Sequence, residues 1–87
     1  MKLSIIIPIY NEKDTILEIL KKIEAVKLSV DKEVIIVDDY SIDGTRDVLG
    51  TLDKSKYTLV LKDKNGGKGS AIKAGIAVAT GDRVIFQ

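Results

Sequence analysis

Residues 34–45 have the sequence Val-Ile-Ile-Val-Asp-Asp-Tyr-Ser-Ile-Asp-Gly-Thr. An apolar, β-branched run ends abruptly in two adjacent carboxylates, Asp38 and Asp39, and a turn-forming cluster of Ser, Asp and Gly follows. Such a run is typical of a strand buried on both faces of a parallel sheet. Two neighbouring acids repel each other and cost solvation energy when they are buried, so a simple turn does not require both. The stretch therefore predicts a parallel α/β fold with a ligand site at the carboxyl end of this strand.

The same alternation of strand and helix runs along the whole chain. Apolar, mostly β-branched runs predict strands, and amphipathic or small-residue segments predict helices. Helices that join parallel strands through right-handed crossovers cover both faces of the sheet. We therefore predict a three-layer α/β fold with a mostly parallel sheet and βαβ crossovers. The expected strands cover residues 3–7, 33–37, 57–61 and 83–87, and the expected helices cover residues 15–27, 45–52 and 70–80.

Local signals predict where these elements end. Pro8 has no backbone N–H and is expected to end the pairing of the first strand. A side-chain oxygen that accepts a free N–H group can cap the start of a helix, and glycine is favoured at its end. The candidates for these positions are Asn11 or Asp14 for the first helix, Ser41 or Asp43 for the second, and Gly81 after the third.

Composition limits the possible functions. With 87 residues, of which 45% are hydrophobic and 31% charged, the chain is expected to form one compact, soluble unit. A net charge of +1 gives no electrostatic reason to bind nucleic acid. The absence of cysteine and histidine excludes disulfides, thiolate or histidine metal sites and a Ser-His-Asp triad within the chain. No apolar run approaches the ~18 residues of a membrane span, and the N-terminus does not resemble a signal peptide. We therefore expect a cytoplasmic protein.

The last expected strand ends at Gln87 without a turn, a cap or a tail. Natural domains seldom stop in the middle of an apolar strand. Residues 1–87 are therefore expected to be one piece of a longer protein, truncated at the fourth strand.

Polar residues follow the first two expected strands. After the first strand, Tyr10 can stack on a flat base or a ribose, and Glu12 can accept hydrogen bonds from sugar hydroxyls. The alternative is an ordinary strand exit with a helix cap at Asn11. After the second strand, Asp39 can accept a hydrogen bond from a base N–H, and either acid of the pair can help to place a metal ion indirectly. The alternative there is a solvated turn capped by Asp39.

A glycine-rich segment, Asn-Gly-Gly-Lys-Gly-Ser at residues 65–70, follows the third expected strand. Glycines expose backbone N–H groups, the start of a helix carries partial positive charge, and Lys68 adds a full charge, so the segment is similar to a phosphate cradle. Its spacing is not that of a P-loop. A flexible glycine loop is the alternative. The other lysines nearby, Lys62, Lys64 and Lys73, are expected to be solvated surface charges.

These three polar segments follow successive parallel strands. The carboxyl ends of such strands lie at one edge of the sheet, where open α/β folds bind their ligands. Taken together, the segments predict a nucleotide site at that edge.

Four segments in this order resemble the N-terminal half of the family 2 inverting glycosyltransferases. They are residues 4–12, 37–45, 65–71 and 79–82. The resemblance covers the whole chain and is greatest to the polyprenyl-phosphate hexose synthases, such as the dolichol-phosphate mannose and glucose synthases.

The resemblance implies a GT-A type, nucleotide-diphospho-sugar transferase fold with sheet order 3-2-1-4 in this half. It implies a UDP- or GDP-hexose donor, a polyprenyl (dolichyl) phosphate acceptor at the cytoplasmic face of a membrane, and Mg²⁺ or Mn²⁺ bridging the diphosphate. The metal ligands, the general base and the acceptor site are expected beyond Gln87, so this chain would hold no catalytic or metal-binding residue and would be inactive alone. The residues expected to line the nucleotide pocket are Pro8, Tyr10, Glu12, Val37, Asp39 and Lys68, with Asp38 in support.

The chain departs from the family pattern Asp-Asp-Gly-Ser-Thr-Asp-Gly-Thr at two positions, where Tyr40 and Ile42 replace Gly and Thr. Because a bulky residue disfavours a positive φ, Tyr40 predicts a turn that needs none at that position.

Two other functions remain open from the sequence. The first alternative to a glycosyltransferase is a stand-alone nucleotide-binding module. The second is a structural α/β fragment without function, in which the exposed edge of the last strand promotes self-association.

Overall fold

The computed structural model describes residues 2–25 and 31–87. Strands and helices alternate along the chain, as the sequence predicts. They are β1 (Lys2–Ile9), α1 (Ile16–Ala25), β2 (Asp31–Asp38), α2 (Thr45–Leu49), β3 (Tyr57–Leu61), α3 (Gly67–Val78) and β4 (Arg83–Phe86).

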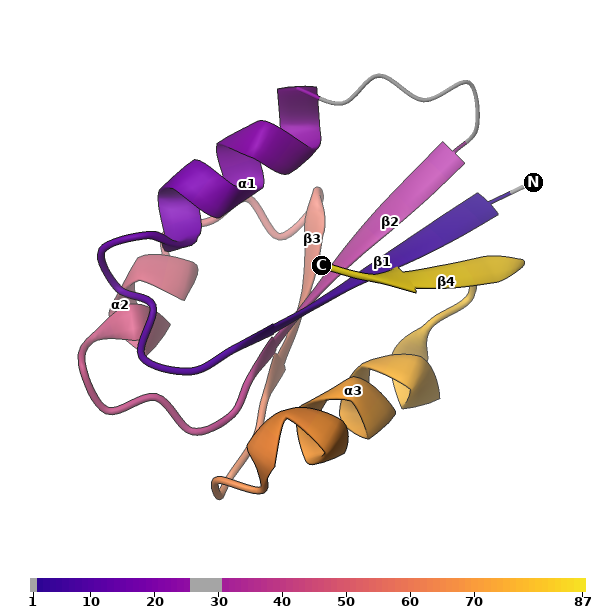
Figure 1. Ribbon diagram of the computed structural model, residues 1–87. Helices are drawn as coiled ribbons and strands as arrows, with labels where there is room; N and C mark the ends of the chain where they lie inside the picture. The colour runs from indigo at the N-terminus through magenta and orange to yellow at the C-terminus, as the bar shows by residue number, and fades with distance from the viewer. Residues whose placement is uncertain (1, 26–30) are drawn as a thin grey trace.

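The four strands form one parallel sheet in the order β3-β2-β1-β4. Ile6 at the centre of β1 lies between Ile35 of β2 and Phe86 of β4. Helices α1 and α2 cover one face of the sheet and α3 covers the other (Figure 1). The three-layer α/β fold and the strand order 3-2-1-4 are therefore confirmed.

The two faces of the central strands make two apolar cores, because successive side chains of a strand point to opposite faces. Val34 and Ile36 of β2 pack with α1 and α2, where Ile16 is fully buried, as the amphipathic pattern predicts. On the other face, Ile35 packs towards Ala71 of α3. The small residues of α3 allow a close approach to the sheet.

Pro8 does not end the pairing of β1, contrary to the prediction. It lies opposite Val37 within the β1–β2 ladder. The backbone N–H of Gln87 donates to the carbonyl oxygen of Ile6, so the even positions of β1 direct their backbone groups towards β4. An N–H at position 8 would point to the same side as β4, but Ile6 is the last β1 residue that pairs with β4. Within the described chain no strand would accept that N–H, so a proline costs no strand hydrogen bond there.

Helix boundaries differ from the predicted ones by one to three residues. Helix α1 begins one residue late, and Val26 and Lys27, predicted as its last residues, lie outside the described residues. Helix α2 ends at Leu49, and a turn follows it. Helix α3 begins three residues before the predicted start and ends at Val78, and its C-cap, Ala79, is extended.

Gly81 is therefore not a helix cap. It lies against β1, where its N–H donates to the Ser4 hydroxyl at 2.8 Å. A Cβ at this position would lie 2.7 Å from the backbone nitrogen of Ser4 and 2.9 Å from the carbonyl oxygen of Lys2. A glycine is required here by the close approach of two backbones.

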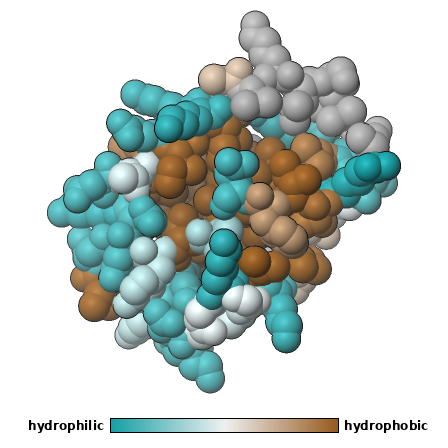
Figure 2. Space-filling model, in the orientation of Figure 1, coloured by the Kyte–Doolittle hydropathy of each residue, from teal (hydrophilic) through white to brown (hydrophobic). Residues whose placement is uncertain are grey.

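Strand β4 leaves apolar side chains exposed. Ile85 lies beside Ile5, on the α1 face of the sheet, and is 42% exposed, whereas Ile5 is buried. Figure 2 shows the apolar area on this side of the molecule, next to β4. Among the described residues, no helix has the length and apolar character needed to cross a membrane.

Candidate functional site

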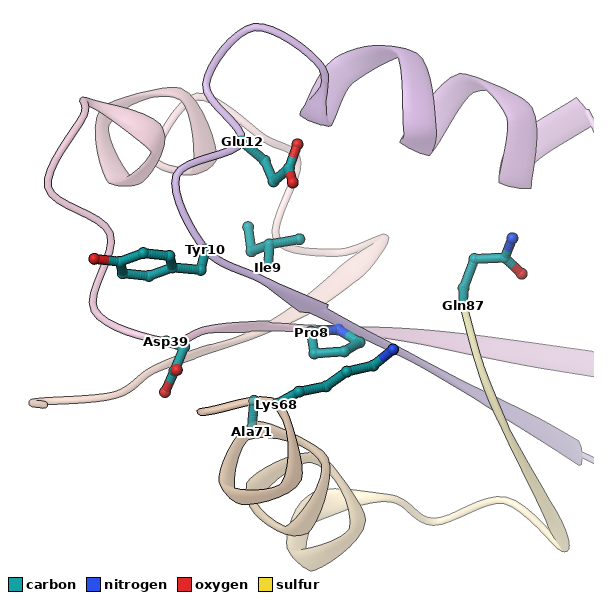
Figure 3. Close-up of a pocket in the computed structure, with 8 residues that line it drawn as sticks. All are labelled: Pro8, Ile9, Tyr10, Glu12, Asp39, Lys68, Ala71 and Gln87. Atoms are coloured by element: carbon teal, nitrogen blue, oxygen red, sulfur yellow. The ribbon is translucent and has the colours of Figure 1, made fainter. Parts of the chain in front are cut away.

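An open cavity of about 250 Å³ lies at the carboxyl ends of β1 and β2, next to the start of α3. It brings together five residues that the sequence predicts, and three that it does not. In Figure 3, Tyr10 and Asp39 lie at one end of the cavity and Gln87 at the other, with Pro8 and the extended Lys68 side chain between them. The predicted residues are Pro8, Tyr10, Glu12, Asp39 and Lys68, and the others are Ile9, Ala71 and Gln87.

Val37 does not reach this cavity. Its side chain is fully buried in the core between the sheet and α3, together with Ile35 and Ala71. The sequence shows that Val37 directly precedes the two acids, but its side chain points to the face of the sheet that α3 covers.

The loop after β1 is joined to the loop after β2 by hydrogen bonds that we call the loop clamp. It begins at Asn11, which has the left-handed conformation that asparagine tolerates well (φ 52°). The N–H of Asn11 donates to the Ser41 hydroxyl at 2.9 Å, and its side-chain oxygen accepts from the N–H of Ile42 at 2.9 Å. Asn11 therefore binds the opposite loop and does not cap α1.

The loop clamp continues over the next two residues. The N–H of Glu12 donates to the Thr45 hydroxyl at 3.0 Å, and the N–H of Lys13 donates to the Asp43 carboxylate at 3.2 Å. Asp43 also accepts the N–H of Thr45, the first residue of α2, at 2.9 Å, while Gly44 occupies the N-cap position. Tyr10 and Glu12 are thus presented to the cavity by a loop that is fixed to its neighbour.

Asp38 lies beneath the second loop and not in the cavity. Its carboxylate is fully buried and accepts the N–H and the hydroxyl of Ser41 and, at 2.6 Å, the Nε–H of Arg46. Ser41 therefore belongs to this network and does not cap α2. The sequence did not single out Arg46, which also donates to the carbonyl oxygen of Lys62. This geometry is compatible with the supporting role predicted for Asp38.

The prediction for Tyr40 is wrong, because Tyr40 has a φ of 68°. The chain must turn back at once after Asp39 so that Ser41 can donate to Asp38, which lies only three residues before it. The Tyr40 ring lies under the guanidinium of Arg46, 5.2 Å from its carbon. This cation–π contact offsets part of the cost of the left-handed backbone conformation, which a bulky residue disfavours.

Asp39 connects β2 to the glycine-rich segment. Its Oδ1 accepts from the Lys62 ammonium at 2.7 Å and from the N–H of Gly66 at 3.0 Å, and its Oδ2 accepts from the N–H of Gly67 at 2.9 Å. Lys62 was predicted to be a solvated surface charge, and this is wrong. Its side chain is 13% exposed and also donates to the Ser70 hydroxyl at 2.6 Å.

The position of Lys62 in the sheet explains its contacts. It directly follows β3, and its N–H donates to the carbonyl oxygen of Asp38, so its side chain leaves the sheet beside Asp39. The start of α3 is held to the sheet by Asp39, so the alternative of a flexible glycine loop does not describe this segment. Lys68, in the first turn of α3, is exposed and borders the cavity.

The electrostatics favour an ionised Asp39. Burial raises the pKa of this carboxyl, but the hydrogen bonds from Lys62, Gly66 and Gly67, together with the Lys62 charge, lower it by more, so its pKa lies below the usual value. The cavity therefore presents an anionic acceptor at Asp39 and a cation at Lys68. No group of three or more His, Cys, Asp or Glu that could hold a metal ion occurs among residues 2–25 and 31–87.

The lowered pKa of Asp39 predicts an acid-dependent loss of stability. The unfolded carboxyl has a pKa of about 3.9, so the stabilisation from Asp39 is fully present above that pH and is lost as the pH falls through the lower, folded pKa. We expect urea unfolding, followed by circular dichroism from pH 6 to pH 2, to show this loss. Because Lys62 lowers the pKa, Lys62→Met should flatten the pH dependence.

Lys64→Met is the matched control, because Lys64 is an exposed lysine of the same segment. Other carboxyls with lowered pKa values, such as Glu33 and Asp43, contribute equally in all three proteins. Parallel pH profiles for Lys62→Met and Lys64→Met would contradict the assignment.

Comparison with known proteins relates this chain to a family. The sequence model described as "Glycosyl transferase family 2" matches residues 4–87. An undecaprenyl-phosphate 4-deoxy-4-formamido-L-arabinose transferase from Aeromonas hydrophila is 38% identical over 87 residues, covering 94% of this chain and 27% of the relative. The chain thus spans about a quarter of the length of the curated relatives that it matches.

Solved structures share the fold over the whole chain. S. aureus TarS 1-349 in complex with UDP has a TM-score of 0.84 at 28% identity, over 100% of this chain and 27% of TarS 1-349. The mannosyltransferase PcManGT from Pyrobaculum calidifontis, in complex with GDP-Man and Mn²⁺, has a TM-score of 0.81 at 34% identity, over 94% of this chain and 25% of that structure. The sheet and its helices therefore correspond to the N-terminal part of the GT-A fold.

Proposed function

The chain belongs to glycosyl transferase family 2, and from this we propose that the full-length gene product transfers a hexose from a nucleotide-sugar to an acceptor. The Aeromonas hydrophila relative is named as an undecaprenyl-phosphate transferase, and a polyprenyl phosphate is the acceptor that we propose. Residues 1–87 would form the nucleotide-binding part of the enzyme.

The cavity at the carboxyl ends of β1 and β2 is the observation that carries this proposal. It combines an exposed aromatic ring, Tyr10, with an anionic acceptor, Asp39, and a lysine, Lys68, at the start of a helix. A nucleotide has the complementary parts, namely a flat base with N–H donors and a diphosphate. At about 250 Å³, the cavity is smaller than the ~300–1,000 Å³ of pockets that enclose whole ligands, so it suits one part of a nucleotide-sugar.

In the proposed mechanism, this chain binds and orients the donor. Tyr10 stacks on the base, Asp39 accepts a base N–H, and Glu12 accepts from sugar hydroxyls. Lys68, in the first turn of α3, offsets part of the negative charge of the diphosphate. An oxygen of the acceptor then attacks the anomeric carbon in line and displaces the nucleoside diphosphate, whose developing charge these groups help to stabilise.

A divalent cation belongs to the proposal for the full-length protein. Mn²⁺ is present in the GDP-Man complex of PcManGT, and Mg²⁺ or Mn²⁺ suits a diphosphate because both are hard cations with oxygen ligands. We propose that its ligands lie mainly beyond Gln87. The described residues offer no cluster of carboxylates that fits such a cation.

A polyprenyl-phosphate acceptor also bears on where the enzyme works. Such an acceptor lies in a membrane, whereas a nucleotide-sugar is dissolved in water. We therefore propose that the protein works in the cytoplasm at a membrane surface.

The proposal predicts that the full-length gene product binds UDP or GDP more tightly than ATP. Isothermal titration calorimetry with each nucleotide, with and without Mn²⁺, measures this. Asp39→Asn should weaken binding about tenfold or more, because it removes the anionic acceptor. Asp63→Asn, an exposed acid near the same site, should leave binding unchanged. Radiolabelled hexose transfer to a polyprenyl phosphate then tests the reaction.

Other outcomes would favour the other functions. A preference for ATP would count against a glycosyltransferase donor site. UDP or GDP binding without any hexose transfer would favour a stand-alone nucleotide-binding module. No binding at all, together with concentration-dependent self-association through β4, would favour a structural fragment, because β4 pairs only with β1 within the described chain.

A further inference from the structure

Asp39 has few acceptor positions left for a ligand. A carboxylate offers about four acceptor positions, two on each oxygen. On Oδ1, Lys62 and Gly66 occupy both positions. On Oδ2, Gly67 occupies one, with an N–H that the Asn65 side-chain oxygen also accepts at 3.2 Å. One position on Oδ2 therefore remains.

The contacts that occupy Oδ1 are held by their surroundings. The side-chain ammonium of Lys62 also donates to the Ser70 hydroxyl. The backbone of Lys62 is fixed as well, because its N–H donates to Asp38 and its carbonyl oxygen accepts from Arg46. A ligand that displaced Lys62 from Asp39 would leave a largely buried ammonium with one partner fewer, which is costly.

Gly66 is fixed in the same way. A Cβ at this position would lie 2.6 Å from the Ser70 hydroxyl oxygen and 2.7 Å from the Lys62 ammonium nitrogen. The backbone is therefore packed directly on these two side chains, and its N–H cannot easily turn away from Asp39.

The two nucleobases that the bound neighbours carry place different demands on such a carboxylate. Guanine presents two adjacent donors, N1–H and the N2 amino group, and a carboxylate pairs with both only when each oxygen has a free position. Uracil presents a single donor, N3–H, between two carbonyl groups. One free position on Oδ2 can accept the single N–H donor of uracil, but it can accept only one of the two guanine donors.

We propose that Asp39 selects uracil over guanine, so that the donor is a UDP-sugar, and that Lys62 is the positioning residue responsible for this selection. The inference rests on the proposed function, because it concerns the same nucleotide site. Neighbours with UDP and with GDP-Man both share this fold, so the fold alone does not select the base.

The first test uses the unaltered full-length gene product. Its affinities for UDP, N3-methyl-UDP and GDP are measured by isothermal titration calorimetry under one set of conditions. We expect N3-methyl-UDP and GDP each to bind about tenfold or more weakly than UDP, because N3-methyl-UDP leaves Asp39 without its donor and GDP leaves one base donor without an acceptor. Binding of GDP as tight as that of UDP, or undiminished binding of N3-methyl-UDP, would overturn the inference.

The second test changes the selection itself. In Lys62→Met a position on Oδ1 is free, so the preference for UDP over GDP should fall several-fold, whereas Lys64→Met should keep the preference of the unaltered protein. An unchanged preference in a folded Lys62→Met variant would remove Lys62 from the argument. If this variant does not fold, undiminished binding of N3-methyl-UDP to the unaltered protein still overturns the inference.

The outcomes separate this inference from the proposed function. Tight binding of GDP with weak binding of UDP would overturn the uracil selection and leave the proposed function standing. Failure to bind either nucleotide would overturn both.

Discussion

Asp38→Ala is expected to lower the free energy of unfolding by about 3 kcal/mol, the largest stability effect among the variants considered. The carboxylate is fully buried and holds Ser41 and Arg46 together. Its removal leaves a buried hydroxyl and N–H of Ser41 without an acceptor and the Arg46 guanidinium without its ion-pair partner. Because Arg46 is partly exposed, water recovers some of this cost, and the lower end of the range for a broken buried pair applies.

Urea unfolding followed by circular dichroism measures the effect. Asp38→Asn keeps the shape of the side chain and an oxygen acceptor, so it should fall between Asp38→Ala and the unaltered protein. Asp63→Ala removes an exposed acid and should stay within about 0.5 kcal/mol of the unaltered protein. Equal stability of Asp38→Ala and Asp63→Ala would contradict the structural role of Asp38.

Two glycine-to-alanine changes should act in opposite directions. Gly81→Ala places a methyl group 2.7 Å from the backbone nitrogen of Ser4, so β4 has to move away from β1, at a cost of about 2 kcal/mol. Gly69→Ala meets no atom within 4 Å and lies in the first turn of α3, so it should stabilise the protein by about 0.5–1 kcal/mol.

The same unfolding experiment compares both variants, and the difference in sign is the decisive observation. Stabilisation by Gly81→Ala would show that the β1–β4 contact is looser than the structure has it. Hydrogen exchange at Gln87, whose N–H donates to Ile6 in the β1–β4 ladder, provides an independent measurement of β4 pairing.

The fold follows from the sequence because its signals are local and repeated. Each strand is an apolar run, and α1 has a regular apolar stripe, so the alternation of the elements and their parallel arrangement are predictable. The start of α3 is only partly predictable. The Asn65 side-chain oxygen accepts the N–H of Gly67 at 3.2 Å, which is a local contact. Asp39, far away in the sequence, accepts the N–H groups of Gly66 and Gly67 at shorter distances, and that contact leaves no local signal.

The sequence predicted most of the residues that gather at the candidate site, but not the hydrogen-bond partners of Asp38 and Asp39. The rule that ligands bind at the carboxyl ends of parallel strands brings Tyr10, Asp39 and Lys68 to one cavity. The partners of the two acids depend on the lateral order of the strands. Lys62 reaches Asp39 because β3 lies next to β2. From the sequence alone, a lysine in a charged loop is indistinguishable from a solvated one.

The loop clamp has a consequence for the engineering of this protein. Each of its two loops supplies donors or acceptors that the other loop satisfies, at Asn11 and Ser41 and again at Glu12 and Thr45. A chimera that took only one of these loops from a relative would combine halves that had not been matched to each other. Residues 10–13 and 41–45 therefore form a single transplantable module, although 27 residues separate them in the chain.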